Sequence, residues 1–457
     1  MDSITNVIDA YNVSYGIKSK IGEGSQGETF LLKDNTHIAK LFKENLNPTE
    51  LRSKINFLIN LGLDKRYYAI PLREITTPHS GYISEFASGM VPLTLLKYQG
   101  HSLSFAEWYQ STGGLLKRYG VLIKLAMSIR ILHAKGLIYC DLSPNNVFVS
   151  EDPKKHNVFL IDMDNLRYKS GIVHNIFTPF YGAPEIVKGL APNTPMSDCY
   201  SFAVIAYELL AFNHPLIGDI VTDGDPELEE KAVRGDLPWV EDSKDDSNCR
   251  TTGIPSEYFI CNSLKNLFKR TFEDGLNNPM KRPSIGEWVD ALNDGLNELL
   301  SCKTCGTHYP YRNAHHCPFC GCEPVLAISL KIQRWEEFEY YDEQTNSINR
   351  HFELQPLILD ELYVDEETSK CLKAFHLLST YDDYDTPIAQ LKIESHDGDV
   401  RLTIIPHNDF TILFKIPDKD IDGYFETEKH FRFNKEHHSK MIVGIKNFDT
   451  PQRVLVI

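Results

Sequence analysis

The chain has 457 residues, of which 42% are hydrophobic and 24% charged, a composition typical of a globular protein with two or three domains. Its net charge of −16 argues against broad binding to nucleic acids or anionic membranes. We see no apolar run of about 18 residues and no basic, apolar leader, so we expect no membrane span, no secretory signal and a cytoplasmic location.

A glycine-rich segment joins two strand-like runs near the N-terminus. Gly22, Gly24 and Gly27 leave room for backbone N–H groups to approach phosphate oxygens closely. Because strands are expected on both sides, a dinucleotide-binding fold, in which a helix follows the glycines, is less favoured. Lys40 lies inside the next apolar run and is therefore a candidate for phosphate contact.

A helix is predicted after Asn47, because apolar residues then recur at helical spacing until Gly62. Glu50, in its first turn, either complements the helix dipole or pairs with Lys40. Two further strands and then a long helix are expected at residues 67–74, 81–86 and 115–134. A small β-rich part is thus followed by a larger helical part.

Polar residues border a predicted hairpin near the middle of the chain. Its two short apolar strands are separated by a polar turn, Glu151–Asn157. Asp141 and Asn146 lie before the first strand and Asp162 and Asp164 after the second, so the hairpin gathers them at one end. Carboxylates and an amide suit Mg²⁺, with a base beside it. The alternative is that these residues only shape the turns.

Downstream, the patterns predict more helices and a solvated insertion. The helices are expected at residues 197–210, 263–272 and 284–299. Residues 222–248 carry ten acidic against three basic residues, together with proline and glycine, which is typical of an exposed surface segment rather than a site.

Five of the ten cysteines fall within Cys302–Cys322. Cys302, Cys305, Cys317 and Cys320 form two CxxC pairs, each followed by glycine, a spacing that suits a structural Zn²⁺ held by four thiolates. A redox-active CxxC is the alternative. The region lacks a basic cluster, which favours protein contact, or a plain spacer, over nucleic-acid binding.

From residue 325 onward, short runs alternate apolar and polar residues between turn signals, which predicts a β-rich domain, with a sandwich as the candidate architecture. The runs are residues 325–332, 352–356, 388–393, 400–405, 410–414, 441–445 and 454–457. We find no catalytic constellation in them and expect an interaction module.

The order of motifs in residues 12–298 resembles that of the eukaryotic-type (Hanks-type) protein kinase family. Ala183-Pro-Glu185, Asp198 and Arg282 are further residues that match the motifs of this family. The resemblance implies contacts with ATP from the small lobe: Gly22, Gly24, Gly27, Lys40, Glu50, Glu85 and Ala87. It implies that Asp141 is the catalytic base, that Asn146 and Asp162 bind Mg²⁺, and that Lys40 positions the phosphates. It further implies that Glu50 pairs with Lys40, that Arg282 pairs with Glu185, and that Asp198 braces the catalytic loop.

The chain departs from this family at three positions. Cys140 replaces the arginine before the base, so activation without loop phosphorylation is expected. Ser143 replaces a lysine, and Asp164 replaces the glycine after the metal-binding aspartate. These changes leave a nucleotide-binding pseudokinase scaffold open as an alternative, and a small-molecule kinase is a third hypothesis. Thr178 favours Ser/Thr acceptors.

The sequence therefore predicts an α+β fold with a bilobal kinase-like domain at 12–298, a zinc ribbon at 299–324 and a β-rich interaction domain at 325–457. We place the small lobe at 12–87 and the large lobe at 88–298. The expected activity is Mg²⁺- and ATP-dependent phosphorylation of Ser/Thr in a protein partner or in the chain itself. A kinase-like domain with these departures, followed by a zinc ribbon, is similar to bacterial kinases of tellurite-resistance and stress clusters. These kinases are encoded beside a PPM-type phosphatase and a von Willebrand A-type protein, so the resemblance implies such partners.

Overall fold

The computed structural model forms two compact units. The first comprises Met1–Gly113, Gly120–Ile254 and Asn266–Val289, and the second comprises Gly114–Tyr119, Pro255–Lys265 and Asp290–Ile457. The structure describes residues 4–24, 27–43, 45–98, 104–168, 175–222, 224, 226–311, 316–323, 326–366, 368–378, 386–396, 399–407, 409–419, 421–434, 440–446 and 453–457.

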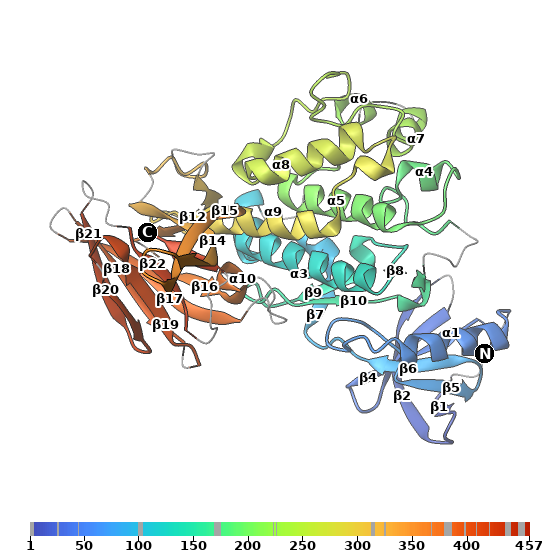
Figure 1. The fold of residues 1–457 in the computed structure, drawn as a ribbon. Coiled ribbons are helices and arrows are strands. Elements are labelled where there is room, and N and C mark those ends of the chain that lie inside the picture. Colours follow the sequence, from blue (N-terminus) through green and yellow to red (C-terminus); the bar gives the residue numbers. More distant parts are fainter. Residues whose placement is uncertain are drawn as a thin grey trace. The chain divides into compact units, whose positions relative to one another are not determined.

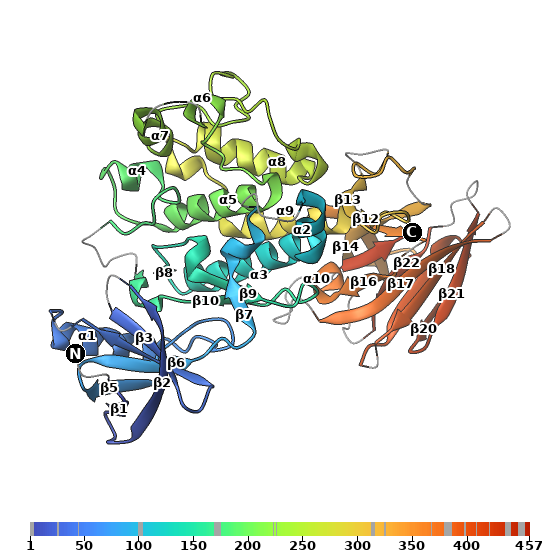
Figure 2. The same ribbon diagram turned by 180° about the vertical axis from the view of Figure 1, so that it is seen from behind.

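A closed barrel with strand order β1-β2-β3-β4-β6-β5 forms the small lobe (Figures 1 and 2). Its strands are β1 (Asn6–Asp9), β2 (Ser14–Glu23), β3 (Gly27–Leu32), β4 (His37–Phe42), β5 (Arg73–Thr77) and β6 (Gly81–Glu85). All neighbouring pairs are antiparallel, and pairing of Ile8 with Thr77 closes the barrel. A small buried core that includes Val7, Leu32 and Ile83 fills the interior.

The strand predicted at residues 67–74 is wrong in its position, because β5 starts only at Arg73. Pro71 lacks an N–H and cannot donate to a strand ladder. The preceding residues instead make an isolated bridge from Tyr68 to Leu160. The Tyr68 hydroxyl also donates to the Ser128 carbonyl at 2.8 Å, so this segment is anchored to the large lobe.

Helix α1 (Pro48–Asn60) forms as the sequence predicts. The Asn47 side chain caps its N-terminus by accepting a hydrogen bond from the Thr49 N–H at 3.0 Å. Leu51 and Ile55 are buried and pack with Phe42 and Tyr82 of the barrel. The helix is thereby fixed against β4, the strand that carries Lys40.

The large lobe contains the predicted hairpin and helices. The hairpin is β9 (Val147–Ser150) paired with β10 (Val158–Leu160), with β7 (Met90–Pro92) beside β9. The short strands β8 (Leu137–Ile138) and β11 (Arg167–Tyr168) form a separate pair. The helices are α2 (Phe105–Ser111), α3 (Gly114–Ala134), α4 (Pro184–Val187), α5 (Pro195–Ala211), α6 (Asp219–Thr222), α7 (Pro226–Val233), α8 (Asn262–Lys269) and α9 (Ile285–Glu298).

The second unit contains two antiparallel sheets that share one core, so the expected β-rich domain is confirmed. One sheet has the order β15-β14-β23-β22-β19-β20 and the other β16-β17-β18-β21. Leu330, Val443, Leu402 and Phe431 represent the two sheets in the common core. The strands are β14 (Ala327–Asp342), β15 (Ser347–Asp365), β16 (Lys370–Lys373), β17 (Pro387–His396), β18 (Asp399–Pro406), β19 (Ile412–Ile416), β20 (Ile421–Phe425), β21 (Lys429–Asn434), β22 (Ile442–Ile445) and β23 (Arg453–Val456), with helix α10 (Ala374–Leu377) after β16.

Buried polar side chains connect this sandwich to the end of α9. The Lys370 ammonium donates to the carbonyls of Leu296, Asn297 and Leu299 at 3.0–3.3 Å, which satisfies acceptors that a helix C-terminus leaves open. Among the residues that the structure describes, no helix is both long and apolar enough to cross a membrane.

Candidate functional site

A cavity of about 220 Å³ lies between the barrel and the β9–β10 hairpin, inside the first unit. Its walls are largely apolar, as a planar base requires. Five of the residues predicted to bind nucleotide or metal line it: Gly22, Lys40, Glu85, Ala87 and Asp162. The remaining lining residues are Ile21, Thr29, Ile38, Ala69, Tyr82, Ser84, Phe86, Met90, Phe148, Phe159 and Ile161.

Gly24 and Gly27, the other two glycines of the glycine-rich segment, close the turn between β2 and β3. The Gly24 N–H donates to the Gly27 carbonyl at 2.8 Å. A Cβ at Gly27 would lie 2.1 Å from the Leu41 carbonyl oxygen, so the approach of β3 to β4 requires glycine here. Ser25 and Gln26, between them, lie outside the described residues.

Lys40 is the cation of the site. Its Nζ lies 2.8 Å from Asp162 Oδ1 and 3.1 Å from Asp164 Oδ1, and only 12% of its side chain is exposed. Burial alone lowers the pKa of Lys40, but Tyr82 and the carboxylates of Asp164 and Asp162 outweigh it, so the net pKa is raised. Lys40 is therefore held as a cation at the rim of the cavity.

The predicted pair between Lys40 and Glu50 is wrong for this structure. Glu50 is exposed on α1, and its carboxylate accepts a hydrogen bond from the Asn47 side chain at 3.1 Å. One turn further along α1, Lys54 is partly buried close to the charges of Asp164 and Lys40. The register of the helix thus presents a cation, not a carboxylate, to the site.

Asp141 accepts hydrogen bonds on both carboxylate oxygens. Thr178 Oγ1 donates to Oδ1 at 2.7 Å, and Asn146 Nδ2 donates to Oδ2 at 3.1 Å. Burial raises the pKa of Asp141, the two hydrogen bonds lower it, and the nearby Asp162 and Asp164 raise it further, with a net increase. An oriented carboxylate of raised pKa is suited to accept a proton.

Asp198 holds the backbone that carries Asp141. Its Oδ2 accepts the Tyr139 N–H at 2.8 Å and its Oδ1 accepts the Cys140 N–H at 3.0 Å. Cys140 has φ +73°, a left-handed conformation that is uncommon for a residue with a Cβ. Burial raises the pKa of the Cys140 thiol to about 12, so it is neutral at physiological pH. The bracing role predicted for Asp198 is confirmed by this geometry.

Two further ion pairs lie in the large lobe. Arg282 and Glu185 form the predicted pair, and the structure shows it to be bidentate, with two N···O distances of 2.7 Å. Lys97 was not singled out from the sequence; its ammonium donates to Glu208 Oε1 and to the Tyr181 hydroxyl, both at 2.7 Å. No local sequence signal connects Lys97 with Glu208, since the contact spans 111 residues.

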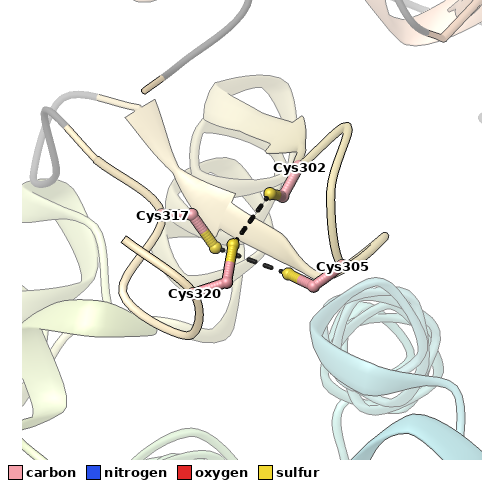
Figure 3. Close-up of side chains that lie close together, drawn as sticks. All are labelled: Cys302, Cys305, Cys317 and Cys320. Atoms are coloured by element: carbon pink, nitrogen blue, oxygen red, sulfur yellow. Dashed lines mark hydrogen bonds between the residues drawn. The ribbon is translucent and has the colours of Figure 1, made fainter. Parts of the chain in front are cut away.

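The four predicted metal cysteines come together in the second unit (Figure 3). Their sulfurs lie within 4.8 Å of one another, with 3.5 Å between Cys302 and Cys320 and 3.6 Å between Cys305 and Cys317. Thiolates around tetrahedral Zn²⁺, at Zn–S distances of about 2.3 Å, are roughly 3.8 Å apart. The cluster is therefore positioned to hold a metal ion of this kind. Its first CxxC lies in the turn between β12 (Leu299–Ser301) and β13 (His308–Pro310), and its second CxxC follows β13.

One part of the chain is similar to known proteins. Residues 101–291 match the family described as "Protein kinase domain". Similar proteins include the "Serine/threonine-protein kinase RUNKEL" of Arabidopsis thaliana (28% identity, 27% of this chain), the "Serine/threonine-protein kinase pkn2" of Myxococcus xanthus (33%, 22% of this chain) and the human "Protein kinase C delta type" (35%, 27% of this chain). The matches cover only 10%, 13% and 18% of those relatives' own lengths.

Proposed function

We propose that this chain, of which residues 101–291 match the protein kinase domain family, transfers the γ-phosphoryl group of ATP, with Mg²⁺, to Ser/Thr hydroxyls of a protein partner or of itself. The observation that carries the proposal is the placement of Lys40 and Asp162 at the rim of an apolar cavity. A second feature supports it, the doubly hydrogen-bonded carboxylate of Asp141 next to Thr178.

Each residue then has a separate task. Lys40 orients the α- and β-phosphates, while the backbone at Glu85 and Ala87 faces the adenine. Asp141 accepts the proton of the acceptor hydroxyl, and Thr178 fixes the orientation of this carboxylate. Asp162 and Asn146 would hold Mg²⁺, whose charge neutralises the phosphate oxygens.

The arrangement of domains belongs to the same proposal. We take residues 12–298 as the kinase domain, 299–324 as a ribbon with structural Zn²⁺ and 325–457 as an interaction domain. Ten cysteines without a disulfide support a cytoplasmic location. The resemblance to stress-response kinases supports a bacterial signalling system with a von Willebrand A-type partner and a PPM-type phosphatase.

A second candidate function is a nucleotide-binding pseudokinase scaffold that assembles partners through the ribbon and the sandwich. The observations that favour it are Ser143, where the family has a lysine, and the engagement of Lys40 by two carboxylates. A scaffold of this kind would bind ATP without transferring phosphate.

Radiolabelled ATP distinguishes the two functions. The full chain, with Mg²⁺ and a mixture of acceptor proteins, is compared with Asp141→Ala and Asp162→Ala. A kinase gives label on protein that is lost in both variants. ATP binding without label on any protein would favour the scaffold and overturn the proposal.

A further inference from the structure

Lys40 has two acidic partners that differ in their surroundings. The Asp162 side chain is 42% exposed and lines the cavity. The Asp164 side chain is only 2% exposed and faces Lys40 from the interior. Asp162 is thus free to turn towards a metal ion, whereas Asp164 is enclosed by protein.

Helix α1 carries a cation, Lys54, whose charge interacts with that of Asp164. The helix packs against the short turn Met163–Asn165 that carries Asp164. Lys54 is attracted by the charge of Asp164 and repelled by those of Lys40 and Arg167. The charge of Asp164 thus acts on two cations, Lys40 of β4 and Lys54 of α1, whereas Glu50 is exposed elsewhere on α1.

Lys40 is largely buried and therefore needs a carboxylate that stays beside it when Asp162 moves away. If Asp162 turns to Mg²⁺, Lys40 keeps a carboxylate only through Asp164. Removing one member of a buried ion pair is strongly unfavourable, because the remaining charge is left without compensation. The enclosed position of Asp164 makes it the partner that can remain in place in both states.

We propose that Asp164 is the positioning residue for the phosphate-binding lysine, and that it connects Lys40 to helix α1, which packs against the turn that carries Asp164. The helix would therefore act on the lysine through the loop after Asp162, not through a glutamate of its own. This inference rests on the proposed function in that Lys40 contacts ATP phosphates. It does not require Asp164 to touch the nucleotide or the metal.

ATP binding by the full chain tests this inference separately from phosphoryl transfer. Affinity is measured by calorimetry with Mg²⁺ and again with EDTA for wild type, Asp164→Asn, Asp162→Asn and Glu50→Gln. We expect Asp164→Asn to weaken binding at least about tenfold in both conditions, the scale of losing one partner of a buried charge pair. Asp162→Asn should remove only the gain due to Mg²⁺, and Glu50→Gln should bind like wild type.

A charge exchange then separates positioning from a merely structural role. Asp164→Gly alone should bind ATP weakly, and adding Lys54→Glu, which supplies the carboxylate from α1, should restore most of the affinity. Thermal unfolding without nucleotide identifies any variant that fails to fold.

Several outcomes would overturn the inference. One is loss in Asp164→Asn only with Mg²⁺, which would make Asp164 a metal ligand. Others are a larger loss in Glu50→Gln than in Asp164→Asn, or no recovery in the folded double variant. If wild type binds ATP but labels no protein, the proposed function fails while this inference remains measurable.

Discussion

Two non-glycine residues at the ends of the central hairpin adopt left-handed backbone conformations. Cys140 has φ +73° and Asp162 has φ +52°. Such residues cost of the order of 1–3 kcal/mol each and persist only where the surroundings determine them. At Cys140 the surroundings are clear, because the Asp198 carboxylate accepts the N–H groups of Tyr139 and Cys140. The strained residue Cys140 directly precedes the predicted base Asp141.

The Arg282–Glu185 pair gives a prediction at the same scale. The Arg282 side chain is fully buried and also lies over the Tyr200 ring at 4.9 Å. Arg282→Met should reduce the free energy of unfolding by about 3–5 kcal/mol, because the Glu185 charge is left unpaired in a largely buried site. Chemical denaturation of the full chain measures this change.

An exposed pair provides the control. Arg270 lies 2.6 Å from Glu287, but both side chains are more than 40% exposed, at 43% and 44%. Arg270→Met should change the free energy of unfolding by no more than about 1 kcal/mol. Equal losses in the two variants would contradict the importance assigned to burial.

At the scale of elements, the sequence predicts those whose signals are local. Helix α1 follows from the cap at Asn47, the apolar spacing and Gly62, and the β9–β10 hairpin from its polar turn. The closure of the barrel by β1 depends on the distant strand β5, and no local pattern reveals it. The long β14–β15 hairpin was expected only as two short runs, because charged residues interrupt its alternation.

His376, in helix α10, leads us to predict that the stability of the fold depends on pH. His376 Nδ1 accepts the Lys373 N–H at 2.9 Å, and Nε2 lies 3.0 Å from the Asn297 amide oxygen, which fits a neutral ring. Burial, with the cations Lys373, Lys370 and Arg453 nearby, holds the pKa of His376 well below its ordinary value. The unfolded chain, with an ordinary pKa of about 6.5, therefore takes up the proton first.

This contribution to stability is complete above about pH 6.5 and is lost as the pH falls below that value. His376→Asn should reduce the loss in melting temperature between pH 7.5 and pH 5, measured by scanning calorimetry. The exposed His351 gives the control variant His351→Asn, which should keep the wild-type dependence on pH. An unchanged profile for His376→Asn would show that this histidine does not titrate with unfolding.

We predict that the stability of the zinc ribbon depends on a bound metal ion. The purified chain should contain about one Zn²⁺, and a strong chelator should lower the unfolding temperature of the second unit, because a closed four-sulfur site contributes to folding directly. Cys320→Ser should have the same effect, whereas Cys249→Ser, outside the cluster, should not. Full stability after metal removal would favour the redox alternative for these cysteines.

At the scale of the whole molecule, the sequence indicates which residues form the site better than how they are paired. The motifs gave Lys40, Asp141 and Asp162, and the structure brings Lys40 and Asp162 together across 122 residues. The expected partner Glu50 followed from the family pattern, and the helix register places Lys54 towards the site instead. Pairing depends on how α1 packs on the barrel, which the sequence does not specify locally.

The most direct test of the central claim is mass spectrometry of phosphorylated residues after incubation of the full chain with ATP, Mg²⁺ and mixed acceptor proteins. The account predicts new phosphoserine or phosphothreonine with wild type and none with Asp141→Asn, although that variant still binds ATP. Wild type that binds ATP but produces no phosphorylated protein, or an Asp141→Asn variant as active as wild type, would contradict it.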